Sequence, residues 1–499
     1  MKRLLTMLLC AVLLFGLFAC GGGDQQIPET TAVPTTEDTL TVKGEGFRVG
    51  FGRAIITPEE NLPLGGFGTS STRVMNDVLD DTYVTCIAMT DEQDNTYLLM
   101  LVDLQRIEDV LIELLRVSVT DATGIPGENI TISCSHTHSI PDLTYDTHEG
   151  IQRYKNLLTQ RFAQAAQAAI ADSLPATMYV GSRDAEGLNF VKHYQHTDEN
   201  GQVQYFGDNF GVSVIDDTTH HVTEAYNAMH MLQFKREGGK DIVISNFRSH
   251  PTLTGGSSEL NLSSDFIGPM RDAVETELDC HFAFMQGACG NINPRSRLSN
   301  ENFGTEENHV EYGYRLAQVA VACIREDMQE KETGRIQSEK ILFEAKVDHS
   351  GDALIPYAKL VQQYWKDNNR NHTLTNAYGR PYGISSYYHA SAIILKAQLP
   401  QTQQIELDVF SIGDTVGFFS APGELFDLMS IEMEEASPFD MTYTVGFANG
   451  DWKYFPYGPC AQYASYESDY GRFEVGTTAE GMMDTWLETL NKFHANAAE

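Results

Sequence analysis

The fold class follows from one stretch of this chain, Ile130-Thr131-Ile132-Ser133-Cys134-Ser135-His136-Thr137-His138. A short apolar run bounded by polar residues predicts a buried strand, and two histidines follow this one at once. In open α/β sheets, ligands bind at the carboxyl ends of the strands. The stretch therefore predicts an α/β fold with a polar site at a strand end.

Five further apolar runs are followed by side chains that can bind a metal or a substrate. They are 97–102 before Asp103, 242–247 before His250, 282–285 before Gln286 and Asn291, 416–419 before Glu424, and 443–447 before Asn449. Six strand ends of this kind predict one site assembled from distant segments. Two or three imidazoles with one carboxylate match a catalytic zinc site that leaves a position for water.

Amphipathic helical periodicity alternates with these apolar runs. The predicted helices are 107–123, closed by Gly124, and 151–173, 310–327 and 425–435. Segment 366–384 is the most loop-like interior stretch and is interpreted as a surface insertion. The alternation predicts a single large α/β domain of layered mixed sheets with flanking helices.

The charge of the chain excludes one class of partner. Its 499 residues include 34 Lys and Arg against 69 Asp and Glu, a formal net charge of −35. Proteins that bind nucleic acid need a surplus of Lys and Arg to neutralise phosphates. We therefore expect no nucleic-acid partner.

The N-terminus resembles a bacterial lipoprotein signal. Lys2 and Arg3 precede an apolar run over 4–18, which is too short for a membrane span, and Ala19 stands before Cys20. We interpret 1–19 as a signal peptide, Cys20 as the lipidation site, 20–45 as a flexible polar linker and 46–499 as the folded domain. The expected location is extracytoplasmic, with a lipid anchor in the bacterial cell membrane. A plain secretory signal with an incidental cysteine is the alternative.

Other chemistries lack their motifs. The chain has no Gly-x-Ser-x-Gly elbow, no His-Glu-x-x-His helix and no nucleotide phosphate loop. The six cysteines of the predicted domain form no Cys-x-x-Cys pair, so a thiolate zinc site is excluded; buried thiols or disulfides are the alternatives. Cys289, in a Gly-rich turn, has two interpretations: a nucleophile near a histidine, or a small buried side chain.

Across most of residues 47–490 these segments resemble, in order, the neutral/alkaline (non-lysosomal) ceramidase family, in its catalytic N-terminal domain. The resemblance is carried by the opening stretch 49–58, by the Gly-rich turn 65–68, by 102–104, by the His-Thr-His-Ser signature at 136–139 and by Pro-Gly-Glu at 422–424. It implies a zinc-dependent amide hydrolase whose substrate is an N-acyl, sphingolipid-like molecule. The family's C-terminal immunoglobulin-like domain is not expected after 486–493.

The resemblance also implies roles for individual residues. The implied zinc ligands are His136, His250, Glu424 and Tyr454. His138 would act beside the metal on water or substrate, and Tyr466 would be a second active-site tyrosine. From the residues alone, Glu424 has another interpretation, as a carboxylate at the N-terminus of the helix predicted at 425–435. The aromatic residues around Tyr454 are interpreted either as a substrate mouth or as core packing.

Two positions depart from the family pattern. Asn293 stands where the family has a serine, so it is expected to bind substrate or water through its amide. Residues 189–193 lack the family's arginine and carry Lys192 nearby. These departures leave the substrate open and motivate an alternative function, a surface lipoprotein that keeps the metal pocket and binds a ligand without turning it over.

Overall fold

The computed structural model describes residues 46–67, 73–207, 215–254, 260–298 and 306–497. All of them lie in one compact unit, Leu40–Glu499. The predicted signal peptide at 1–19, the lipidation site at Cys20 and the linker at 20–45 lie outside the described residues. Within the described part, no helix combines the length and the apolarity that a membrane span requires.

A mixed sheet of nine strands forms the centre of the described residues. Along the sheet the strands are β14 (His281–Gln286), β12 (Ile242–Phe247), β11 (Ala228–Arg236), β6 (Leu174–Asp184), β1 (Arg48–Ile55), β3 (Tyr83–Thr90), β4 (Thr96–Val102) and β5 (Ile130–Cys134), and β16 (Gln329–Lys331) pairs with β6. Most neighbouring strands are antiparallel, but β12 with β14 and β4 with β5 are parallel.

A second, four-stranded sheet packs against the first. It consists of β17 (Ile336–Lys346), β18 (Thr402–Ile412), β19 (Val416–Ser420) and β21 (Met441–Val445). Short strands form the remaining pairs: β2 (Asp77–Val78) with β13 (Asn261–Leu262), β7 (Phe190–Val191) with β15 (Ile292–Asn293), β20 (Glu424–Leu425) with β22 (Tyr454–Phe455), and β8 (His193–Thr197) with β9 (Val203–Gly207) and β10 (Thr219–His221).

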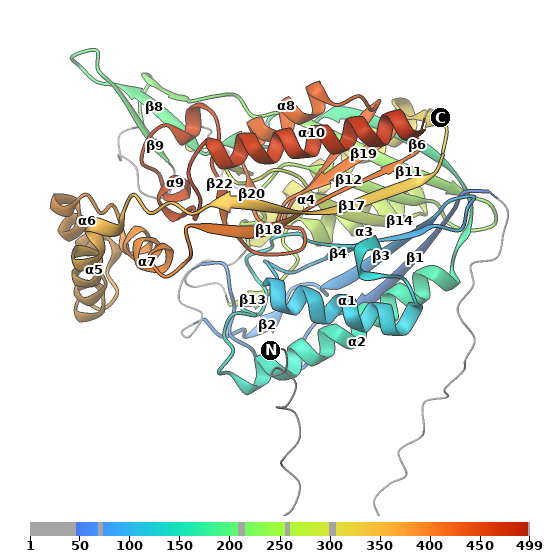
Figure 1. Cartoon of the computed structure of the whole chain (residues 1–499), viewed down its shortest axis with the longest axis horizontal. Helices are drawn as coiled ribbons and strands as arrows, with labels where there is room; N and C mark the ends of the chain where they lie inside the picture. The colour runs from blue at the N-terminus through green and yellow to red at the C-terminus, as the bar shows by residue number, and fades with distance from the viewer. Residues whose placement is uncertain (1–45, 68–72, 208–214, 255–259, 299–305, 498–499) are drawn as a thin grey trace, which may run out of the picture. The chain divides into compact units, whose positions relative to one another are not determined.

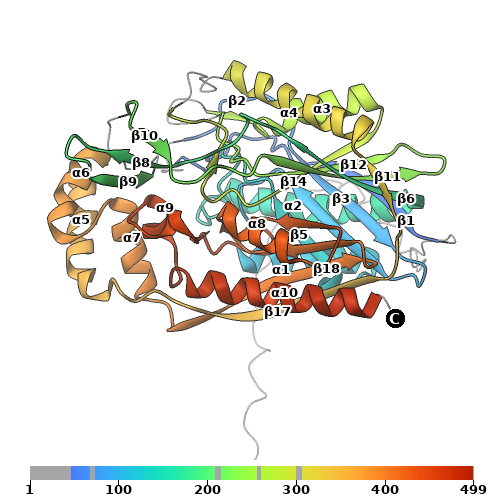
Figure 2. The same cartoon turned by 90° about the horizontal axis from the view of Figure 1, so that it is seen from above.

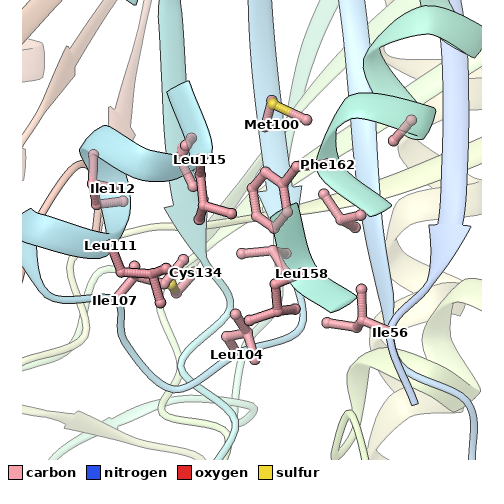
Figure 3. Close-up of a cluster of buried hydrophobic side chains, with 14 of the residues drawn as sticks. Ile56, Met100, Leu104, Ile107, Leu111, Ile112, Leu115, Cys134, Leu158 and Phe162 are labelled. Carbon is pink, nitrogen blue, oxygen red and sulfur yellow. The ribbon is translucent and has the colours of Figure 1, made fainter. Parts of the chain in front are cut away.

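Helices cover the outer faces of both sheets (Figures 1 and 2). The large sheet is covered by α1 (Asp109–Thr123), α2 (Glu149–Ala171), α3 (Ile267–Leu278) and α4 (Glu306–Glu326), and the small sheet by α8 (Asp427–Ala436) and α10 (Thr477–Ala497). Figure 3 shows the apolar core under α1 and α2, where Leu115, Leu158 and Phe162 meet Met100 of β4. A separate core joins the two sheets through Leu99 of β4, Phe410 of β18 and their neighbours. The predicted layered α/β fold is confirmed.

The four predicted helices form, but seven of their eight ends differ from the structure, by one to four residues. Helix α1 ends at Thr123 and Gly124 follows at φ 77°, as the glycine predicts. Helix α2 stops at Ala171 because β6 begins at Leu174. Helix α8 begins at Asp427, two residues later than predicted, because Glu424 and Leu425 pair in β20.

The interpretation of 366–384 as a loop is wrong. The stretch contains the last two residues of α5 (Ile355–Asp367), all of α6 (His372–Gly379) and a 3-10 turn (Arg380–Tyr382), and α7 (Tyr387–Lys396) follows it. The turn between α5 and α6 matches the polar composition. Stacked rings stabilise the group, including Tyr364 on Tyr378 at 4.1 Å between centroids. These helices, which we call the helical insertion, lie between β17 and β18 in the chain.

Candidate metal centre

One cavity of about 580 Å³ brings together all seven residues predicted for the site. They are His136, His138, His250, Asn293, Glu424, Tyr454 and Tyr466. They come from segments up to 330 residues apart in the chain, at the ends of β5 and β12, in β15, β20 and β22, and at the start of α9 (Tyr466–Tyr470). The prediction of a site assembled at strand ends therefore describes where these residues lie.

Two histidines present a lone pair to the same point in the cavity. The Nδ1–H of His136 donates to the carbonyl oxygen of Gln105 at 2.7 Å, and that of His250 donates to the carbonyl oxygen of Cys289 at 3.1 Å. Because a carbonyl only accepts, each Nδ1 carries the proton and each Nε2 is free to bind a cation. Metal-binding histidines are commonly oriented in this way.

His138 completes a group of three imidazoles but is held differently. Its Nε2 lies 3.2 Å from the Nε2 of His136 and 3.2 Å from the Nε2 of His250. Its Nδ1 is buried and has no hydrogen-bond partner. The ring instead packs edge-on against Phe67, with 5.1 Å between centroids. His138 thus faces the same point without the carbonyl contact that fixes the other two rings.

Glu424 contributes a carboxylate to this group. Its Oε2 lies 3.8 Å from the Nε2 of His136 and 4.0 Å from that of His250, and it has no hydrogen-bond partner. The parallel pairing of β20 and β22 sets Glu424 opposite Tyr454, whose hydroxyl donates to the carboxylate. The alternative interpretation of Glu424 fails, because α8 begins only at Asp427 and Glu424 faces the histidines.

Burial controls the charge of these groups. It lowers the pKa of His136 and His138 well below the usual value, with further lowering by the other imidazoles, and it lowers the pKa of His250 to about 3. Burial also raises the pKa of Glu424 to about 8, opposed by the charge of Lys192 and the Tyr454 hydroxyl. At neutral pH the imidazoles are therefore uncharged, which is the form that binds metal.

The geometry of the donors fits a divalent cation. Two nitrogens that ligate one tetrahedral zinc at 2.0–2.1 Å lie about 3.3 Å apart. The 3.2 Å separations from His138 Nε2 match this spacing. A buried carboxylate oxygen without a donor is costly unless a cation or proton compensates it. His136, His138 and His250 therefore form a candidate metal site with Glu424 beside it.

Three residues around the site have a positive φ, which residues other than glycine rarely adopt. His136 has a φ of 67°, Phe447 of 48° and Lys453 of 65°. Such positions cost of order 1–3 kcal/mol each and cluster at functional sites. Phe447 stacks on the ring of His136, with 3.7 Å between centroids. The positive φ values of His136 and Phe447 therefore help to set the orientation of the His136 ring.

The two departures from the family pattern lie side by side. Strand β15 pairs with β7, so that Asn293 is opposite Phe190, and the amide of Lys192 donates to the carbonyl of Asn291 at 2.8 Å. Lys192 is buried, lines the cavity and pairs with Glu467 at 2.9 Å. Asn293 and Lys192 thus occupy one region of the cavity.

Sequence reasoning missed several residues that line the cavity. Among them are Arg106, Lys453, Tyr388 and Tyr470. Arg106 follows β4, so the strand-end pattern that selected Asp103 could have reached it. Tyr388 lies in the helical insertion, and its ring meets that of Tyr466 edge-on at 5.5 Å. No sequence pattern indicates that this insertion reaches the site.

Other strand-end residues hold the framework. Asp103 pairs with Arg271 at 2.7 Å, and Asn291 donates to Asp427 at 2.7 Å. Asn449 accepts from the amide of Ile132 at 2.9 Å. The prediction that all six strand ends carry site residues is therefore too broad. Of the aromatic residues near Tyr454, Phe455 is core packing.

The cysteine thiols take no part in this site. Each of the six in the described residues is buried as a free thiol. Burial, with the charge of Glu424, raises the pKa of Cys289 well above its usual value. The thiolate is the nucleophilic form of cysteine, so Cys289 fits the interpretation of a small buried side chain.

No family model matches this chain, and no curated protein matches it. Its structure is similar to the crystal structure of a neutral ceramidase from Pseudomonas aeruginosa, with a TM-score of 0.65 and 15% identity over 90% of this chain and 75% of that one. The chain has a ceramidase-like fold. A structure described as ceramidase complexed with C2 gives the same TM-score and identity, with 76% of that chain covered. At this identity the ceramidase likeness shows the fold alone, and the site rests on its own geometry.

Proposed function

We propose that this protein is a zinc-dependent hydrolase that cleaves the amide bond of an N-acyl substrate. The observation that carries the proposal is the convergence of Glu424 and three imidazoles, two buried and that of His138 half-buried, in one cavity. The similarity of the fold to ceramidases supports an amide, sphingolipid-like substrate. A catalytic site needs an accessible cavity beside the metal, and the cavity here has the size of a ligand pocket.

Of the donors in the candidate metal site, His136, His250 and Glu424 would hold the zinc, with Tyr454 against the carboxylate. His138, whose Nδ1 has no orienting contact, would lie beside the metal and face the water or the substrate. The carbonyl contacts of His136 and His250 support these two as ligands, since they fix the Nε2 lone pairs. A bound Zn²⁺ supplies Lewis acidity and activates water at neutral pH.

The remaining residues orient the substrate and move protons. The Nε2 of His138 lies beside the ligand nitrogens and, without a fixed Nδ1 contact, can accept a proton from water. Burial raises the pKa of Tyr466 well above its usual value, so its hydroxyl stays protonated and can donate to the developing oxyanion. The amide of Asn293 can hydrogen-bond to the substrate but cannot act as a nucleophile.

We further propose that a lipid on Cys20 tethers this hydrolase outside the bacterial cytoplasmic membrane. The basic and apolar residues 2–18 and the Ala-Cys pair at 19–20 support the proposal.

The test is zinc content and amide turnover in three histidine variants. His250→Ala should lose zinc and all turnover, because it removes an oriented ligand. His138→Ala should retain most of the zinc and lose at least about a hundredfold in kcat, since general acid–base groups contribute about 10²–10⁴-fold. Zinc is measured by elemental analysis, and turnover with short- and long-chain N-acyl amides.

His372→Ala provides the matched control, because His372 lines the same cavity but lies on α6 away from the imidazole group. It should keep its zinc. Full zinc occupancy in His250→Ala would remove His250 from the ligand set. Stoichiometric zinc without turnover in the unaltered protein would favour the ligand-binding alternative over the hydrolase.

A further inference from the structure

Four cationic side chains line the cavity of a strongly acidic protein. They are Arg106, Lys192, Arg295 and Lys453. The chain as a whole has a net charge of −35, so a chance sample of its charged side chains would be mostly acidic. Among the residues that the structure describes, Asp142 and Glu424 are the only carboxylates in the lining, and Glu424 belongs to the metal site.

The pairing of these charges leaves cations in excess. Lys192 is neutralised by Glu467. The negative charge of Asp142 favours the charged form of Arg73, which lies beneath the lining, and that of Arg106. Among the described residues, and counting Arg73 with the lining, five cations face three carboxylates that are not part of the metal site, Asp142, Asp451 and Glu467.

One buried carboxylate is shared by two cations of the cavity. Asp451 lies 2.5 Å from the ammonium of Lys453 and 3.2 Å from the Nε of Arg106. The positive charge of Arg472 and the negative charge of Asp109 also interact with Asp451, and these two charges offset each other. Since Asp451 offers one negative charge, Arg106 and Lys453 together keep a surplus.

Arg295 supplies the second surplus charge. Its Nη2 donates to the carbonyl of Thr252 at 3.3 Å, and within the described ranges it makes no ion pair. Its side chain is half-buried at the cavity. A guanidinium that is partly desolvated and lacks a carboxylate is a ready partner for an anionic ligand.

The three cations Arg106, Lys453 and Arg295 are linked to residues of the metal site through the backbone. Arg106 follows Gln105, whose carbonyl orients His136. The carbonyl of Lys453 accepts from the amide of Glu424 at 2.8 Å. The carbonyl of Thr252 accepts from Arg295, and the hydroxyl of Thr252 donates to the carbonyl of His250 at 3.3 Å. An anion held by these cations would therefore lie close to the reacting amide.

We propose that the substrate carries an anionic group, a carboxylate, sulfonate or phosphate, which Arg106, Lys453 and Arg295 bind beside the metal site. This inference rests on the proposed hydrolase function and narrows its substrate to an anionic N-acyl amide. Water adds across the amide bond, the C–N bond breaks, and a carboxylic acid and an amine leave. The anionic group stays unchanged on one of the two products.

Matched substrate pairs test the charge and show which side of the amide carries it. N-hexanoylglycine against N-hexanoylethanolamine places the carboxylate on the amine side, and N-ethylglutaramic acid against N-ethylpentanamide places it on the acyl side. With the zinc-loaded protein, the anionic member of one pair should have a kcat/KM at least about tenfold higher. Arg295→Gln should reduce this preference toward one, because a charge-assisted contact is lost.

Arg297→Gln is the control, two residues along and exposed, and it should keep the preference. Turnover with no preference in either pair would overturn the anionic substrate and leave the hydrolase standing. If none of the four amides is turned over, calorimetric binding decides: tight binding of an anionic member that Arg295→Gln weakens supports the anion site while contradicting the hydrolase. Equal or absent binding by the two proteins overturns the anion site.

Discussion

At the scale of single residues, Lys192 shows how a buried charge is kept in this site. Its side chain is 4% exposed and that of Glu467 is 1% exposed, with 2.9 Å between Nζ and Oε1. Burial alone would lower the pKa of Lys192, but the carboxylates of Glu467 and Glu424 raise it. Burial would raise the pKa of Glu467, but Lys192 and His193 hold it well below its usual range. Each charge depends on the other.

Glu467→Gln should therefore lower the free energy of unfolding by about 3–5 kcal/mol at pH 7, because it leaves the ammonium buried without a partner. The folded pKa of Glu467 is depressed, so its stabilisation is present above the unfolded pKa of about 4.3 and is lost as the pH falls toward the folded value. The difference between the two proteins should shrink below about pH 4. Urea unfolding at several pH values measures it.

Glu339→Gln removes one partner of an exposed pair with Lys492, whose side chains are 40% and 55% exposed, and should change stability by at most about 1 kcal/mol. An equally small effect of Glu467→Gln at pH 7 would contradict the account of the buried pair.

At the scale of elements, the two-residue strands β20 and β22 place the carboxylate of the site. Their parallel pairing sets Glu424 opposite Tyr454. Close approach of the two strands requires a glycine at 423, since a Cβ there would lie 2.2 Å from the carbonyl oxygen of Lys453. Strands this short carry little intrinsic preference, so their position comes from these contacts.

Gly423→Ala should weaken zinc binding at least about tenfold, because β20 must move and carries Glu424 with it. Chelator competition measures the zinc affinity. Gly127→Ala is a suitable control, since the nearest atoms to its added Cβ are 3.9 Å away on Arg116. Unchanged zinc affinity in Gly423→Ala, together with lower stability, would show that Glu424 is not needed to hold the metal.

The strands and the residues that follow them were largely predictable from the sequence, whereas several cations of the cavity were not. The six apolar runs all form strands, since a buried strand needs an unbroken apolar run. The imidazoles and Glu424 were found because they follow these runs. Arg106 also follows such a run, but its side chain does not ligate a metal. Lys192 and Arg295 were not found, because a lone cation in a sequence looks the same whether it is solvated or buried beside a site. Their places depend on tertiary contacts such as that of Lys192 with Glu467.

At the scale of the described unit, the helical insertion stands apart from the two-sheet core. The strands on either side of it pair directly, with Lys346 opposite Thr402, and the amide of Val347 donates to the carbonyl of Gln401 at 3.0 Å. Figure 1 shows α5, α6 and α7 grouped beyond the ends of β17 and β18. The insertion has its own small apolar core, which includes Val361 and Ile393. It therefore interrupts what would otherwise be a hairpin.

The insertion nevertheless reaches the cavity. His372 and Tyr388 line the cavity, and Tyr388 packs against Tyr466. On the insertion side, Ser385 donates to Asp469 and Lys396 pairs with Asp348 at 2.6 Å. The core thus supplies the predicted metal ligands, and the insertion supplies part of the cavity wall.

Replacing residues 349–399 by an Asn-Gly turn should separate these two contributions. The turn suits a two-residue hairpin connection between paired strands. The shortened protein should fold and bind zinc as tightly as the full chain, because every predicted metal ligand lies outside the insertion. Its kcat/KM for N-acyl amides should fall at least about tenfold, since Tyr466 loses its contact with Tyr388 and the cavity opens to water. Circular dichroism, zinc content and turnover are measured together.

Tyr388→Ala keeps the insertion and tests the same contact when the shortened protein does not fold. It should retain its zinc and show most of the loss in kcat/KM. Unchanged turnover in both variants would mean that the insertion does not surround the substrate. Loss of zinc from a folded, shortened protein would mean instead that the core cannot hold the metal alone, because the contacts of Asp469 and Tyr466 with the insertion would then be needed to keep α9 in place.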